Sequence, residues 1–193
     1  MLTPKGYTNK SQIENYLLTT VNAIFHDQLD DWIAMMETHI NKTTGRNFIA
    51  DTVATEKLYD GNGENELLVD DFIGTPTIEI NGVALDSDQY LVYPANTEKK
   101  NILKRVSGGI WSKDDQSIGV TAKWGYSAEV PNDIIFATTV LVAGIINYSS
   151  KDSQGQIATK TIGRYSVTYK DKKQWQDFDQ INTIIKSYKK FSF

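Results

Sequence analysis

The spacing of apolar residues changes twice along the chain, from helical to strand-like and back to helical. In the first fifty residues apolar positions recur every three to four residues, in two successive stripes. Ser11 with Glu14 has the form of a capping box that opens the first helix, and Gly45 stands where a C′ glycine would end the second. The first part therefore predicts two amphipathic helices, with the stripes Ile13, Leu17, Val21, Ile24 and Leu29, Trp32, Ile33, Met36, Ile40.

From about Val53 the period falls to two, and β-branched and aromatic residues become frequent. Turn residues separate these segments, and Asn81-Gly82 between apolar residues is a strong hairpin signal. We interpret residues 51–126 as an antiparallel β module placed between helices. Its predicted strands are Val53–Tyr59, Glu66–Val69, Thr77–Ile80, Gln89–Tyr93, Ile102–Val106 and Ile118–Trp124.

The stretch Lys123–Tyr148 contains the most apolar helix that the pattern predicts. Pro131 suits the first helical turn, and residues 134–146 are apolar on nearly every face. Such a helix is typical of a core, with subunit contact as the alternative. We expect no membrane span, because the run is short and interrupted compared with the roughly 20 apolar residues that a bilayer requires.

After this helix the pattern predicts a polar loop at Ser149–Gly155, an extended segment at Thr159–Tyr169 and a final amphipathic helix. The domain boundaries that follow are 1–50 for an N-terminal helical part, 51–126 for the β module and 127–193 for the C-terminal helices and extended arm. The final helix carries the stripe Trp175, Phe178, Ile181, Ile185, Tyr188.

Composition and motifs argue against catalysis. The formal net charge of −4 is unlike that of a dedicated nucleic-acid-binding protein, and the chain has no cysteine. The two histidines, His26 and His39, fall on nearly opposite sides of a helix that carries both, so we expect no metal site. Asp60, Asn62 and Glu64 resemble the start of a calcium loop, but a hairpin turn explains them better. We expect no cofactor, no enzymatic activity and, since an apolar leader is missing, no secretion.

Several segments together resemble the head–tail connector (adaptor) proteins of tailed bacteriophages and related prophages. They are Trp124-Gly125-Tyr126 followed by Val130-Pro131, the run IGRYSVTY at 162–169 and the closing run IIKSYKK at 184–190. The similarity extends over most of the chain. It implies an α+β fold, with a mainly α-helical adaptor core of about four helices and an antiparallel β module inserted between the second and third helices.

The resemblance also implies a structural virion protein of the neck, made in the host cytoplasm. Family members form a homo-oligomeric ring, typically of twelve copies, beneath the portal protein. They extend the DNA channel and provide a platform for a head-completion (stopper) or tail protein. DNA would pass through without sequence-specific binding, and no membrane is involved.

Two hypotheses concern the surfaces of such a ring. The final helix and its basic, aromatic terminus would dock onto the portal, and Ser149–Tyr169 would be an arm that orders on assembly by pairing with a neighbour's strand. The predicted portal or subunit interface comprises Tyr165, Val167, Tyr169, Tyr188, Lys189, Lys190, Phe191 and Phe193.

Two alternatives stay open. The first is another neck protein, a stopper or a tail terminator. The second is a carbohydrate-binding or hydrolase module that would use Trp111, Trp124 and Tyr126 as stacking residues.

Overall fold

The computed structural model describes residues 3–151, 160–162, 165–167 and 172–190. The chain divides into two compact units. Met1–Arg46 and Val130–Phe193 form one, which we call the helical unit, and Asn47–Glu129 form the other, which we call the sheet unit. The backbone therefore crosses between the units twice, once after Arg46 and once after Glu129.

The expected fold class is wrong. The protein is not a mainly helical core that carries an inserted module. It contains a six-stranded antiparallel sheet within residues 55–124, and four α-helices of the described chain flank this sheet in the sequence. The physical reason is that the strands bury enough apolar side chains to build a hydrophobic core of their own, with Phe72, Leu103, Trp111 and Val120 fully buried at its centre.

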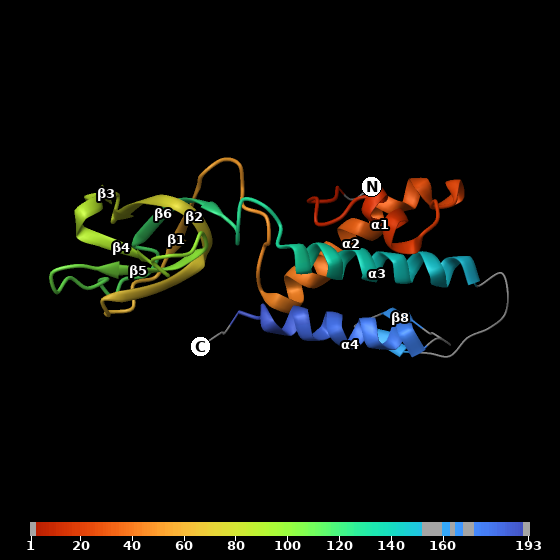
Figure 1. Ribbon diagram of the computed structural model, residues 1–193. Coiled ribbons are helices and arrows are strands. Elements are labelled where there is room, and N and C mark those ends of the chain that lie inside the picture. Colours follow the sequence, from red (N-terminus) through yellow and green to blue (C-terminus); the bar gives the residue numbers. More distant parts are fainter. Residues whose placement is uncertain (1–2, 152–159, 163–164, 168–171, 191–193) are drawn as a thin grey trace. The chain divides into compact units, whose positions relative to one another are not determined.

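The helical unit is organised around helix α3. Its elements are α1 (Lys10–Leu17), the 3-10 turn Ala23–Phe25, α2 (His26–Thr44), α3 (Asn132–Lys151) and α4 (Lys172–Ser187). Helix α3 packs against α1, α2 and α4, and its buried side chains include Ile134, Ala137 and Val142 (Figure 1). The prediction of a buried helix in this stretch is therefore confirmed.

The length argument against a membrane span is wrong, because the helix continues through Ser149 and Ser150, where the sequence predicted a loop. Residues Asn132–Ser150 are long and apolar enough to cross a bilayer by length and composition alone. More than half of this window is buried inside the protein. Burial of this kind is typical of the core helix of a soluble protein.

Two short strands complete the helical unit. Strand β7 (Lys160–Ile162) pairs antiparallel with β8 (Tyr165–Val167) over three residue pairs. This hairpin lies within the segment that the sequence predicted to be extended.

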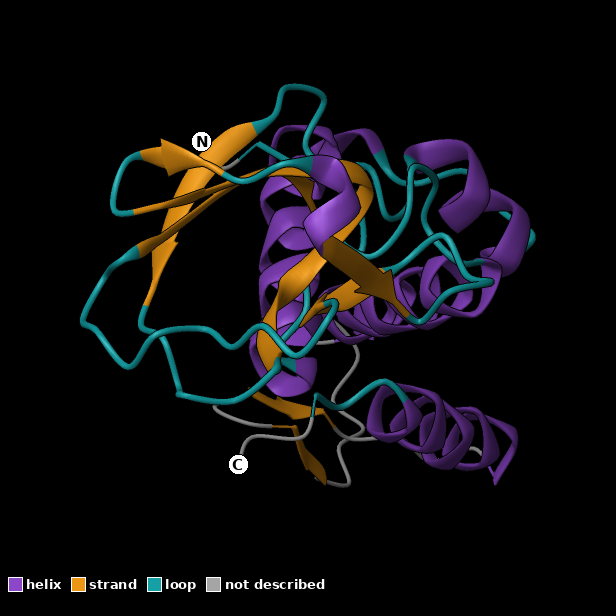
Figure 2. Ribbon diagram, turned by 90° about the vertical axis from the view of Figure 1, so that its left-hand side faces the viewer, coloured by secondary structure: helices purple, strands orange, loops and turns teal. Residues whose placement is uncertain are grey.

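The sheet of the other unit has the strand order β1-β6-β2-β5-β4, and β3 pairs with β2 beside this path. Figure 2 shows its strands in orange. The bounds are β1 (Thr55–Tyr59), β2 (Glu66–Ile80), β3 (Val83–Ala84), β4 (Tyr90–Tyr93), β5 (Lys100–Arg105) and β6 (Ile118–Trp124), with a 3-10 turn at Ser87–Gln89. The bounds predicted for β6 are confirmed.

Strand β2 is one strand of 15 residues, where the sequence predicted two short ones. Gly74 and Pro76 in its middle are typical of a loop, which explains the wrong prediction. In the structure the register shifts twice. One shift lies before this point, between Leu68 and Phe72 against β5, and the other spans it, between Ile73 and Thr77 against β6. Such irregularities bend a strand, so the first half of β2 pairs with β5 and the second half with β6.

The segment after β6 closes the sheet unit through Gly125. Its N–H donates to the carbonyl of Asp71 (2.7 Å), and the N–H of Tyr126 donates to the carbonyl of Asn47 (2.8 Å). Gly125 has φ 146°, and a Cβ there would lie 2.4 Å from the Cα of Ala50. Only glycine fits such an approach of two backbones.

Candidate functional site at the end of helix α4

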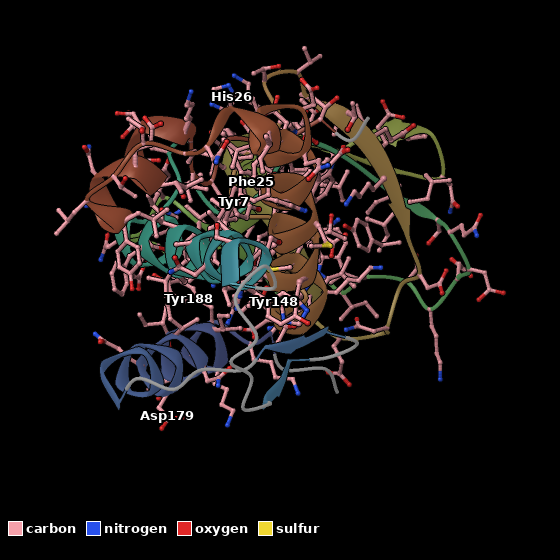
Figure 3. All side chains as sticks on the ribbon, turned by 90° about the vertical axis from the view of Figure 1, so that its right-hand side faces the viewer. Tyr7, Phe25, His26, Tyr148, Asp179 and Tyr188 are labelled. Carbon is pink, nitrogen blue, oxygen red and sulfur yellow. The ribbon has the colours of Figure 1, made fainter. Side chains whose placement is uncertain are left out.

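The predicted interface residues fall into three groups. Tyr165 and Val167 lie on β8, of which the structure describes the backbone, and Tyr169, Phe191 and Phe193 lie outside the described residues. Tyr188, Lys189 and Lys190 directly follow α4 (Figure 3 labels Tyr188). The described site therefore consists of the end of α4 and what it contacts.

Tyr188 joins the end of α4 to the beginning of α3. Its hydroxyl lies 3.0 Å from both carboxylate oxygens of Asp133, which is in the first turn of α3. The same carboxylate accepts from the N–H of Ile134 (2.9 Å), and its negative charge at a helix N-terminus is favourable. Tyr188 thus holds α4 in place within its own chain.

The end of α2 meets the same segment. The N–H of Lys190 donates to the carbonyl of Thr44 (2.7 Å), and Nε of Arg46 donates to the carbonyl of Tyr188 (2.6 Å). Gly45 caps α2 in the left-handed conformation, with φ 70°, as the sequence predicted. At each of the two helix ends, a backbone carbonyl group therefore accepts a hydrogen bond from the residues that follow the other helix.

Positive charge gathers at this meeting point. Lys42 and Arg46 come from the end of α2, and Lys186, Lys189 and Lys190 from the end of α4. The negative ends of the two helix dipoles favour cations here. Since Lys186 and Lys189 are exposed, they present a basic surface on a protein of net charge −4. We call Lys42, Arg46, Lys186, Lys189 and Lys190 the basic end.

An unexpected polar contact holds the N-terminal segment on α2. Glu37 is 2% exposed, and its carboxylate accepts hydrogen bonds from the N–H groups of Lys5 (2.5 Å), Gly6 (2.9 Å) and Tyr7 (2.8 Å). The hydroxyl of Tyr7 also donates to Oδ1 of Asn41 (2.7 Å). Sequence reasoning missed this contact, although an acidic residue on the buried stripe of α2 is a signal that could have found it.

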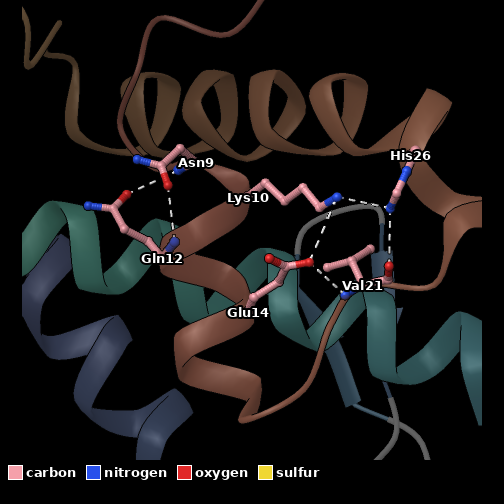
Figure 4. Close-up of polar contacts among 6 residues, drawn as sticks. All are labelled: Asn9, Lys10, Gln12, Glu14, Val21 and His26. Carbon is pink, nitrogen blue, oxygen red and sulfur yellow. Dashed lines mark hydrogen bonds and ion pairs between the residues drawn. The ribbon is translucent and has the colours of Figure 1, made fainter.

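A second polar cluster shapes the loop between α1 and α2 (Figure 4). Glu14 accepts from the N–H of Val21 (3.0 Å), while Nε2 of His26 lies 3.1 Å from both Nζ of Lys10 and the carbonyl oxygen of Val21. The loop exposes Leu18 (91%) and Ile24 (69%). His26 is therefore a structural contact of this loop. Among the described residues no group of three or more metal-binding side chains comes together.

The aromatic residues of the carbohydrate alternative do not form a platform. Trp111 is fully buried and Trp124 is 4% exposed, and their indole N–H groups donate to the carbonyls of Leu103 and Thr55. Tyr126 packs against Phe48, with ring centroids 5.6 Å apart. Stacking on a sugar requires an exposed ring face, so this alternative loses the residues on which it depended.

The turn that resembles the start of a calcium loop uses its side-chain oxygens in hydrogen bonds within the protein. Oδ1 of Asn62 accepts from the N–H of Glu64 (3.0 Å), and Oδ1 of Asp60 accepts from the N–H of Gln116 (2.7 Å). These bonds are those of a turn packed on the loop that follows β5.

Comparison with solved structures gives a likeness over the whole chain. A structure described as the neck of an empty GTA (gene transfer agent) particle, computed with C6 symmetry, matches with a TM-score of 0.61 and 9% sequence identity. That match covers 100% of this chain and 94% of the other. The chain therefore shares its overall fold with that structure.

A second structure of this fold is described as the neck of a native GTA particle, computed with C12 symmetry. It matches with a TM-score of 0.56 and 8% identity, and covers 95% of this chain and 88% of the other. No protein-family model and no curated protein matches the sequence. At this level of identity, the likeness shows a shared fold and leaves the residues of any interface to be argued from the chain itself.

Proposed function

We propose that this protein is a non-enzymatic structural component of the neck of a phage-like particle. In this role it forms an adaptor ring beneath the portal, extends the DNA channel and carries a stopper or tail protein. The observation that carries the proposal is the whole-chain likeness to neck structures, which includes both the helical unit and the sheet unit. The symmetry of those necks supports a ring of identical subunits.

The charge of the chain agrees with a channel component. A wall that bound phosphates strongly would slow the passage of DNA, because each neutralised phosphate adds to affinity. The net charge of −4 avoids such binding over the protein as a whole. The basic end is then a local feature that suits an acidic protein surface.

We assign portal docking to this basic end together with Phe191 and Phe193, which lie outside the described residues. Lys186 and Lys189 are exposed, whereas Tyr188 is engaged by Asp133. The lysines therefore provide the charge that a partner meets, and Tyr188 provides the rigid attachment of α4 that positions them. Rim charges of this kind mainly set the association rate and its dependence on salt.

Electron microscopy of the protein mixed with the portal ring of the same particle tests the function. We expect a ring of this protein on one face of the portal. A protein that leaves the portal bare but binds the end of a tail tube would instead be a tail terminator. If it joins only a preformed portal–adaptor complex, it is a stopper.

A charge reversal tests the docking surface. Lys186→Glu with Lys189→Glu should weaken binding to the portal and reduce its salt dependence. Lys113→Glu, at an exposed lysine of the sheet unit, is the matched control and should bind like the wild type. Equal binding by the double variant and the control would remove the basic end from the portal contact.

A further inference from the structure

Strand β4 is an edge of the sheet whose own residues carry no charge. Among the described residues it pairs with β5 alone, and its four residues, Tyr90–Tyr93, include no charge and no proline. Natural edge strands are usually blunted by lysine, proline or a bulge, because open backbone groups recruit further strands. Strand β4 is short and Pro94 follows it directly, but within its four residues nothing blocks the pairing of a further strand.

The hydrogen-bond pattern shows which backbone groups of β4 are open. The N–H of Arg105 donates to Asn65 on the β2 side (2.8 Å), and the N–H of Val106 donates to Gln89 on the β4 side (3.1 Å). Because bonded and non-bonded pairs alternate in an antiparallel ladder, Leu91 and Tyr93 face β5 with their backbone groups. The N–H and C=O groups of Tyr90 and Val92 therefore point to the free edge.

The opposite edge of the same sheet is protected. Lys57 of β1 pairs with Val120 and so lies on the inner face, where its Nζ is 2.8 Å from Asp70 and 4.6 Å from the ring centroid of Trp124. An inward-pointing lysine is one of the devices by which proteins block an edge. The two edges of the sheet therefore differ: a lysine blocks further pairing at β1, and no such charge stands on β4.

Apolar side chains continue from β4 over the outer face of the sheet. Register pairs place Leu68, Ile102 and Tyr93 in one row across three strands, and Leu91 in the next row beside Lys104. Leu91 is 48% exposed. A strand added to β4 would thus gain both backbone hydrogen bonds and an apolar contact.

The chain also contains a strand pair that can accept a further strand. The hairpin β7–β8 has three residue pairs, and among the described residues its strands pair only with each other. Strand β8 also contacts helix α3, which supports the pair, but each of the two strands keeps one edge that pairs with no other described strand. The three-residue strands of the hairpin match the four-residue edge of β4 in length.

We propose that the β7–β8 hairpin of one subunit adds to strand β4 of the next, which joins neighbouring subunits of the ring. This inference rests on the proposed ring function and names its subunit contact. The contact is heterologous, with β4 on one side and the hairpin on the other, and a repeated heterologous contact forms a ring when the rotation between subunits closes. The pairing uses backbone groups, so it requires little of the side chains of the hairpin.

Since the chain has no cysteine, cross-linking can test this contact without background. The variant Leu91→Cys with Ser166→Cys is treated with a short bis-maleimide reagent. We expect a ladder of dimers, trimers and larger species up to the closed ring. Each single variant can reach only the dimer. The control Val83→Cys with Ser166→Cys keeps the hairpin cysteine and moves the other to a 70% exposed site on β3. It should give at least tenfold less of the ladder.

Blocking the edge gives a second readout. Leu91→Lys should abolish ring formation on the portal in electron micrographs, and Val83→Lys should leave it intact. Equal ladders in the two double-cysteine variants, or a cross-linked monomer without a ladder, would overturn the proposed contact. Rings that persist with Leu91→Lys would also overturn the contact while the neck function stands. A wild-type protein that forms no ring on any neck component would overturn the function itself.

Discussion

The hydroxyl of Tyr188 lies 3.0 Å from both carboxylate oxygens of Asp133, although the two residues are 55 positions apart. This contact connects the first turn of α3, the central helix of the helical unit, with the segment that leaves α4. The proposed portal-docking lysines stand directly beside it in the sequence. The contact therefore links the core of the unit to the surface that we expect to bind a partner.

We predict that Tyr188→Phe destabilises the protein by about 1–2 kcal/mol, since a hydrogen bond to a charged group is lost at a half-buried site. A double-mutant cycle with Asp133→Ala in urea unfolding measures the coupling and separates it from the effect of Asp133 on the helix end. Hydrogen exchange of Lys186–Lys190 should also become faster. A coupling energy near zero would show that the contact does not hold α4.

Loss of the buried carboxylate of Glu37 should be more severe. Glu37→Gln keeps the size of the side chain but removes charge from a group that receives three backbone N–H bonds, so we expect a loss of at least about 2 kcal/mol. The matched control is Glu79→Gln at an exposed position of β2, which should change stability by less than about 0.5 kcal/mol. Equal urea midpoints for the two variants would contradict the role of Glu37.

Helix α3 could be predicted from the sequence because apolarity on all faces is a local property. The sequence could not tell which of two adjacent isoleucines faces inward. Ile134 is fully buried while Ile135 is only half-buried, because the positions of α1, α2 and α4 around the helix decide this. Packing partners from distant segments are not encoded in the spacing of one helix.

The start of α1 was predicted two residues too late. The structure places the capping box on Asn9 and Gln12, whose side chains each accept a 3.0 Å bond from the other's N–H. Ser11 and Glu14 have the same spacing, and asparagine is as good an N-cap as serine, so the pattern alone had two solutions. Glu14 instead holds Val21 in the following loop.

The contacts of the candidate site were less accessible from the sequence than the elements that carry them. The stripe of the final helix and the basic run after it indicated a surface helix. That Arg46 donates to the carbonyl of Tyr188 depends on a tertiary contact across 142 positions. The Glu37 contact likewise joins residues 30 to 32 positions apart.

Gly125 provides a test of the closure of the sheet unit. We predict that Gly125→Val prevents folding of this unit, because a Cβ would meet backbone atoms of Ile49 and Ala50 at 2.4–2.7 Å. Gly74→Ala is the control, since Gly74 also has a positive φ (76°) but open space around it. It should cost about 1 kcal/mol from backbone strain alone. Circular dichroism and thermal unfolding distinguish the two, and similar losses would contradict the close-approach argument.

His39 should make stability depend on pH. Burial lowers the pKa of His39 below its ordinary value of 6.5. The unfolded state therefore takes up a proton before the folded state does, so the free energy of unfolding should fall as pH drops through about 6.5. It should level off below the folded-state pKa. His39→Gln should flatten this slope between about pH 8 and 5.5 in urea unfolding. His26→Gln, at the other histidine, should leave the His39 slope in place, and an unchanged slope in His39→Gln would show that another group is responsible.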